Sequence, residues 1–133
     1  MTKKMEEAKN LMLQGFNCSQ SVSAVFAEAY GQDKANILRI ASGFGGGMRQ
    51  AEVCGAVSGA IMVIGFKYGI DETNMQDKGL CYEKTLEFMN HFKEKNNSMK
   101  KLIILLNQSQ YFIDYPLLKP DICLKHSYNP VIF

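Results

Sequence analysis

Apolar residues recur at helical spacing along most of the first hundred positions. The first such stripe predicts a helix over residues 3–14, ended by a glycine, and it consists of Met5, Ala8, Leu11 and Met12. A second stripe in "FNCSQSVSAVFAEAYG" consists of Val22, Val25, Phe26 and Ala29. Asn17 is the candidate N-cap of this second helix, and Gly31 is its candidate stop.

The same pattern predicts three further helices. "DKANILRIASG" predicts a short helix with Asp33 near its start and Gly43 near its end. The next helix begins near Val53 or Cys54 and runs to about Tyr68. The fifth covers residues 74–96, with an amphipathic pattern that includes Leu80, Leu86, Phe88, Met89 and Phe92. No segment before residue 100 alternates as a strand does.

After Ser98 the character of the chain changes. Glutamate disappears, residues 102–106 suit either a helical turn or a short strand, and Pro116, Pro120 and Pro130 interrupt the remaining segment. We therefore predict an all-α, single-domain bundle of about five helices with an irregular C-terminal tail. Residues 1–98 form the helical domain, and residues 99–133 are an atypical tail, as part of that domain or as an irregular extension.

Composition and charge narrow the function classes. The 133 residues carry a formal net charge of +2 with no basic cluster, which argues against a nucleic-acid partner. The longest uncharged apolar run, residues 53–66, is shorter than the roughly 20 residues of a membrane-spanning helix. Glu6 and Glu7 lie where an export signal needs apolar residues. We expect a cytoplasmic protein.

Four cysteines, Cys18, Cys54, Cys81 and Cys123, are widely separated and form no Cys-x-x-Cys pair. Cys18 and Cys54 each lie at the start of a predicted helix. Unpaired amides and the helix dipole at such a position favour a thiolate, which is both the nucleophile and the metal ligand. Cys18 and Cys54 are therefore the candidate catalytic residues. The alternative is that both are small buried residues of the core.

The loop "ASGFGGGMRQ" precedes Cys54 directly. Its consecutive glycines allow backbone amides to converge, so Gly45, Gly46, Gly47 and Arg49 are candidates for binding an anionic cofactor or ligand. The loop lacks the residues of a nucleotide-binding motif. The alternative is a tightly bent connection that brings Cys54 towards Cys18.

Small residues follow Cys54 at helical spacing. Gly55 and Gly59 share one helix face, flanked by Ala56 and Ala60, and together they leave a groove in which another helix backbone can lie. We interpret these four residues as a packing surface.

"GFNCSQSV" and "ASGFGGGMRQAEVCGAVSGAIMVIGFKYG" resemble the C_GCAxxG_C_C family, small bacterial and archaeal proteins described as redox-active. The resemblance covers roughly residues 5–98. The family's first cysteine falls on Cys18, and its Cys-Gly-Ala-x-x-Gly motif falls on Cys54, Gly55, Ala56 and Gly59. The resemblance implies a helical, prokaryotic protein whose cysteines gather at one site. That site would carry out electron or disulfide exchange, or hold a metal centre.

The chain departs from the family after residue 98. No cysteine follows "NNSMKKL", the expected Cys-Pro near the end is missing, and Cys123 matches the fourth cysteine only by position. The composition of the tail suits a frame-shifted, AT-rich coding end. This hypothesis is tested by reading the other two frames after codon 98, and it fails if neither encodes an acidic, cysteine-containing segment.

Three functions remain open from the sequence. The first is a thiol oxidoreductase in which Cys18 and Cys54 exchange disulfides with an unknown protein or a small thiol, which requires no cofactor. The second is a metal or iron–sulfur protein with Cys18, Cys54 and Cys123 as ligands. The third is a non-catalytic helical interaction module, or a degraded copy of a family member.

Overall fold

The computed structural model describes residues 3–96, and these form an all-helical bundle. The helices are α1 (Lys3–Leu13), α2 (Cys18–Ala27), α3 (Lys34–Ile40), α4 (Gly55–Tyr68) and α5 (Met75–Asn96). Short helical turns lie at Glu28–Tyr30 (η1), Ala41–Phe44 (η2) and Gly47–Ala51 (η3). The all-α prediction is confirmed. The predicted tail, with Cys123, lies outside the described residues.

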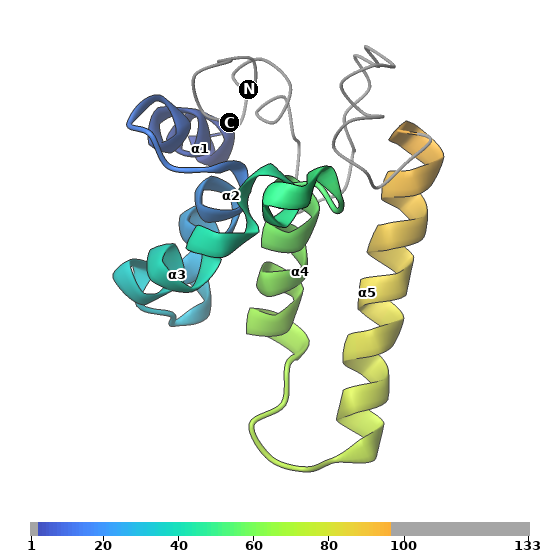
Figure 1. Ribbon diagram of the computed structural model, residues 1–133. Coiled ribbons are helices and arrows are strands. Elements are labelled where there is room, and N and C mark those ends of the chain that lie inside the picture. The colour runs from blue at the N-terminus through green and yellow to red at the C-terminus, as the bar shows by residue number, and fades with distance from the viewer. Residues whose placement is uncertain (1–2, 97–133) are drawn as a thin grey trace.

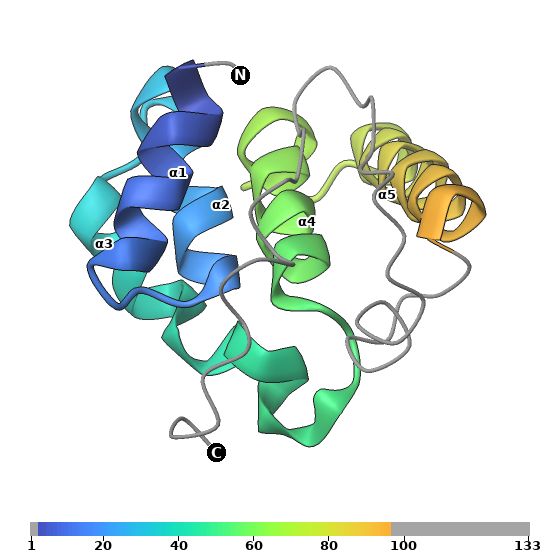
Figure 2. The ribbon, with the colours of Figure 1, turned by 90° about the horizontal axis from the view of Figure 1, so that it is seen from above.

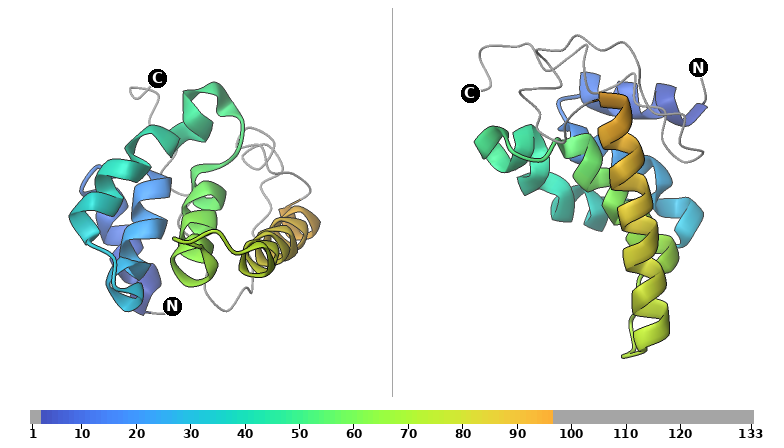
Figure 3. Two further views of the ribbon diagram at one scale, coloured as in Figure 1. Left: turned by 90° about the horizontal axis from the view of Figure 1, so that it is seen from below. Right: turned by 90° about the vertical axis from the view of Figure 1, so that its right-hand side faces the viewer.

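Helix α4 lies in the middle of the bundle (Figures 1 and 2). It packs against α2 on one side and against α5 on the other, while α1 and α3 pack against α2. α4 and α5 run antiparallel and are joined by the turn between Tyr68 and Met75 (Figure 1). The side view shows α5 reaching past the end of α4 (Figure 3, right).

Asp33 and Gly31 lie at the helix ends for which the sequence predicts them, whereas α3 ends at Ile40 and not near Gly43. The Asp33 carboxylate accepts a hydrogen bond from the Asn36 amide at 2.7 Å, and Gly31 ends the second helical segment in a left-handed conformation. Asn74 accepts from the amides of Gln76 and Asp77 at the start of α5. These bonds satisfy backbone donors that the first turn of a helix leaves unpaired.

The core lies between α1, α2, α4 and α5. Its most deeply buried members include two α5 aromatic residues, Phe88 and Phe92, whose ring centroids are 6.0 Å apart. The amphipathic pattern predicted for α5 is only partly correct, because Leu80 and Leu86 are exposed. Within residues 3–96, no helix combines the length and apolar character that a membrane crossing requires.

Candidate functional site

Cys18 is the first residue of α2, as its spacing predicts. Asn17 caps the helix: its Oδ1 accepts a hydrogen bond from the Gln20 amide at 3.0 Å, and Gln20 Oε1 accepts one from the Asn17 amide at 2.9 Å. This reciprocal capping box fixes the direction in which the chain enters α2. Asn17 is predicted as the N-cap from the sequence, but the role of Gln20 is not. The Asn-x-x-Gln spacing, which is typical of a capping box, is visible in the sequence.

The same two side chains attach the following segment to the start of α2. Asn17 Nδ2 donates to the Ser42 carbonyl at 2.9 Å. Gln20 Nε2 donates to the Leu38 carbonyl at 2.8 Å and to the Ser42 hydroxyl at 2.9 Å. The end of α3 and the η2 turn are therefore held beside Cys18 by hydrogen bonds from the side chains that also form the helix cap.

Cys54 is the N-cap residue of α4. Its carbonyl accepts hydrogen bonds from the amides of Val57 and Ser58, at 2.9 and 3.1 Å, so the helix begins where the sequence predicts. The positive end of the α4 dipole lies at this residue. Each of the two cysteines thus occupies a helix N-terminus.

Gly55 brings the two helix starts together. A Cβ atom added to Gly55 would overlap the Sγ atom of Cys18 and would lie 3.1 Å from the Ser19 nitrogen and 3.2 Å from the Phe44 carbonyl oxygen. The Cys18 sulfur therefore packs directly on the Gly55 backbone. Gly55 follows Cys54 in the chain, and Cα atoms of adjacent residues are about 3.8 Å apart. The Cys18 sulfur thus lies against the residue that directly follows Cys54.

Both cysteines are buried. Cys18 is 6% exposed and Cys54 is 1% exposed, and both belong to the apolar core cluster. Both are present as thiols. Burial disfavours the charged form of a thiol, whereas a helix N-terminus favours it, so these two general effects oppose each other at this site.

Small residues continue along the α2–α4 contact. A Cβ on Gly59 would lie 2.7 Å from the Ser19 carbonyl oxygen, so the backbones of α2 and α4 approach closely here. The Ser58 hydroxyl donates to Ser19 Oγ at 3.3 Å and to the Gly55 carbonyl at 3.1 Å. The sequence predicts the glycine packing surface correctly. The contact between Ser58 and Ser19 is not predicted from the sequence. The available signal was the serine at every second position from Ser19 to Ser23.

The glycine-rich connection is more regular than predicted. It forms the η2 turn and then a left-handed turn in which φ is 64° at Gly46, 66° at Gly47, 56° at Met48 and 61° at Arg49. Glycine adopts this conformation without strain, but each L-residue there costs about 1–2 kcal/mol. The turn is closed by the Glu52 amide, which donates to the Gly47 carbonyl at 3.3 Å.

The connection also packs on the cap of α2. A Cβ on Gly45 would lie 2.6 Å from the Asn17 side chain, so only glycine fits at this point. The side chains of Met48 and Arg49 are exposed. The connection is tightly bent, packs on the cap of α2 and leads directly into Cys54. Binding of an anionic ligand by Gly45, Gly46, Gly47 and Arg49 stays a prediction.

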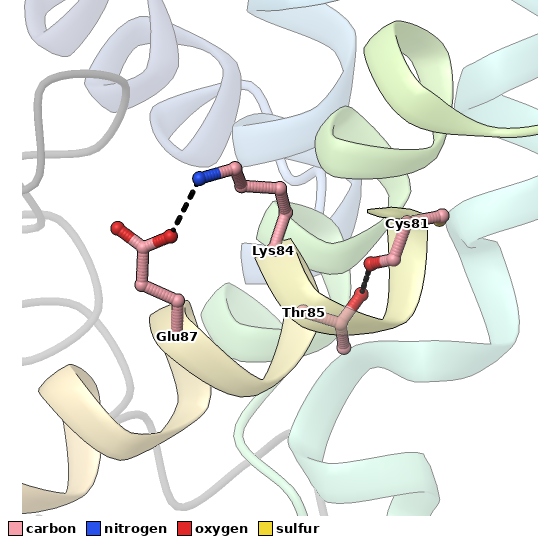
Figure 4. A network of polar contacts seen from close by, with 4 residues as sticks. All are labelled: Cys81, Lys84, Thr85 and Glu87. Atoms are coloured by element: carbon pink, nitrogen blue, oxygen red, sulfur yellow. Dashed lines mark hydrogen bonds and ion pairs between the residues drawn. The ribbon is translucent and has the colours of Figure 1, made fainter. Parts of the chain in front are cut away.

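Cys81 does not belong to this site. It lies in the second turn of α5, where its carbonyl accepts a hydrogen bond from Thr85 Oγ1 at 2.9 Å (Figure 4). The neighbouring Lys84 and Glu87 form an ion pair at 2.9 Å, and Glu87 raises the pKa of Lys84. Because α4 and α5 are antiparallel, the start of α5 lies beside the end of α4, far from Cys54 (Figure 1).

The predicted metal ligands can be located only in part. Cys18 and Cys54 lie near each other, whereas Cys123 is outside the described residues. Among residues 3–96, no group of three histidine, cysteine, aspartate or glutamate side chains is arranged to hold a metal ion. Within residues 3–96, the thiols near each other at this site are those of Cys18 and Cys54, and two thiols would need further ligands to hold a cluster.

Comparison with known proteins gives one match. The model of the C_GCAxxG_C_C family, described as "Putative redox-active protein", matches residues 16–113, which include both Cys18 and Cys54. No curated protein and no solved structure matches the chain.

Proposed function

This chain belongs to the C_GCAxxG_C_C family, which is described as redox-active, and we propose that it is a dithiol oxidoreductase whose working pair is Cys18 and Cys54. Its partner is the disulfide of another protein or of a small thiol, and its setting is a reducing prokaryotic cytoplasm. The packing of the Cys18 sulfur on Gly55, next to Cys54, is the observation that supports this proposal most directly.

The proposed exchange has two steps. The Cys18 thiolate attacks one sulfur of the partner disulfide, which forms a mixed disulfide and releases the first partner thiolate. The Cys54 thiolate then attacks the Cys18 sulfur, which forms the Cys18–Cys54 disulfide and releases the second partner thiolate. The protein loses two electrons and two protons, and the partner disulfide is reduced to two thiols.

The assignment of the attacking residue follows from exposure and position. Cys18 is the more exposed thiol, at 6% against 1% for Cys54, so an external disulfide reaches it first. Cys54 lies deeper and serves as the resolving thiol. The connection that contains Met48 and Arg49 is exposed beside this site, and we propose that the partner approaches over it.

Peptide mapping after mild oxidation tests the proposal. Trypsin places Cys18, Cys54 and Cys81 on three separate peptides, because basic residues separate them. The reduced full-length protein is equilibrated with oxidised and reduced glutathione, quenched with acid and digested. We expect one dominant cross-linked species that joins the Cys18 peptide to the Cys54 peptide. Persistence of both cysteines as thiols, or linkage of either to Cys81 or Cys123, would contradict the assignment.

Single substitutions separate the roles of the two thiols. Cys54→Ser should accumulate a mixed disulfide at Cys18 with glutathione, since the resolving step is lost. Cys18→Ser should accumulate much less mixed disulfide, because Cys54 is the less exposed of the two thiols, at 1% against 6%. Cys81→Ser is the matched control and should form the Cys18–Cys54 disulfide as the wild type does. Equal behaviour of Cys54→Ser and Cys81→Ser would mean that Cys54 is a structural core residue.

The metal alternative has its own readout. Protein purified without oxygen would then show visible absorption bands and a stoichiometric metal content that both Cys18→Ser and Cys54→Ser abolish. A colourless, metal-poor preparation that still forms the Cys18–Cys54 disulfide would exclude a resident cluster and support the dithiol function.

A further inference from the structure

Helix α5 carries an exposed apolar stripe that the bundle does not cover. Met75, Tyr82 and Leu86 are 75%, 60% and 59% exposed. The helix packs on α4 and the core through a different face, which contains the buried residues Phe88 and Phe92. α5 therefore has two apolar faces, and residues 3–96 bury only one of them.

The exposed stripe has the spacing of a coiled-coil seam. Met75, Gly79, Tyr82, Leu86 and the half-buried Met89 are separated alternately by four and three positions. This alternation keeps one face of a helix against a parallel or antiparallel partner helix. With 22 residues, α5 is about 33 Å long, enough for the seam to span several turns.

Charged residues of opposite sign border the seam. Lys78 lies on one side of it and Glu83 on the other, five positions later. Neither residue forms an ion pair within residues 3–96. In a parallel two-stranded coiled coil, a residue that directly precedes a seam residue faces the partner residue five positions later. Lys78 and Glu83 have this spacing, and such flanking charge pairs determine which helices associate.

We propose that α5 is a homodimerisation helix, and that two copies of this chain pair in parallel along the stripe of Met75, Tyr82 and Leu86. In this arrangement Lys78 faces the partner subunit's Glu83, and the two-fold axis repeats the contact. An antiparallel pairing centred on Tyr82 would instead place Glu83 beside the partner subunit's Glu83, and like charges would oppose it.

The contact is self-complementary, as a two-fold interface requires. It is confined to one face of one helix, so its area is at the small end for protein interfaces. We therefore expect monomer and dimer to exchange at micromolar concentrations. Met75, Tyr82 and Leu86 lie outside the face of α5 that packs on the core, and the stripe meets that face only at Met89. The proposal therefore does not depend on the chemistry of Cys18 and Cys54.

Sedimentation equilibrium of the reduced full-length protein tests the proposal over micromolar concentrations. We expect a monomer–dimer equilibrium that Leu86→Ser weakens by roughly tenfold or more, because a buried leucine at a seam contributes strongly. Leu80→Ser is the matched control. Leu80 is an exposed leucine on the same helix outside the seam, and its substitution should leave the equilibrium unchanged.

Charge reversal tests the parallel orientation. Lys78→Glu and Glu83→Lys should each weaken the dimer several-fold, since each places like charges across the interface. The double variant, which restores opposite charges, should regain most of the wild-type affinity. Circular dichroism confirms that every variant keeps its helical content.

Three results would overturn the proposal. The first is a wild-type protein that stays monomeric throughout the concentration range. This result would also be obtained if another part of the same chain covered the stripe. The second is equal weakening by Leu86→Ser and Leu80→Ser. The third is a double charge variant that is no tighter than either single variant.

Discussion

Gly59 shows how a single missing side chain sets the distance between two helices. A Cβ there would lie 2.7 Å from a backbone oxygen of α2, which cannot move without moving the helix. We expect Gly59→Ala to lower the free energy of unfolding by about 1–3 kcal/mol, the usual cost of overpacking a core. Urea denaturation of the reduced protein measures the change.

Gly65 in the same helix provides the control. A Cβ at Gly65 meets nothing within 4 Å, so Gly65→Ala should be neutral or stabilising by up to about 1 kcal/mol, because alanine favours the helix. An equal loss of unfolding free energy in the two alanine variants would contradict the close approach of α2 and α4 at Gly59.

Among the helical elements, the cap of α2 has a second role that the cap of α5 lacks. Asn17 caps its helix and also donates to the Ser42 carbonyl, so it holds the segment after α3 beside Cys18. Asn17→Ala should therefore lower stability by about 1 kcal/mol or more and also slow formation of the Cys18–Cys54 disulfide. Urea denaturation and the rate of cross-link formation in glutathione buffer measure the two effects.

Asn74 is the matched comparison because it caps α5 through Oδ1 alone, away from Cys18 and Cys54. Asn74→Ala should cost a similar amount of stability and leave the rate of disulfide formation unchanged. A similar loss of rate in the two variants would show that the Asn17 effect is only global destabilisation.

For the molecule as a whole, a disulfide between Cys18 and Cys54 would close a loop that contains α2, α3 and the glycine-rich connection. Closing a loop of this size restricts the unfolded chain and stabilises a protein by about 3–4 kcal/mol when the native geometry is unstrained. We expect the oxidised protein to unfold at a higher urea concentration than the reduced protein.

Cys54→Ser should show no such difference between oxidising and reducing conditions, and Cys81→Ser should show the full difference. Oxidised wild-type protein that is less stable than the reduced form would indicate a strained bridge, which is more easily reduced and suits a transient catalytic disulfide better than a structural one.

Local sequence information was enough to predict the helices, the caps Asn17 and Asp33 and the small-residue face of α4. Each of these depends on residues within a turn or two of one another, such as Asn17 with the first turn of α2 or Gly55 with Gly59. The helix-start positions of Cys18 and Cys54 belong to this local information. The family pattern was visible in the same residues.

Three features depend on packing between distant segments: the Cys18 sulfur packs on Gly55, Met48 and Arg49 take a left-handed turn, and Leu86 is exposed while Phe88 is buried. The first depends on how α2 and α4 dock. The second is a conformation that L-residues avoid unless surrounding contacts impose it. The third depends on which of two apolar faces of α5 meets α4, and hydrophobic spacing along a single helix does not distinguish between them.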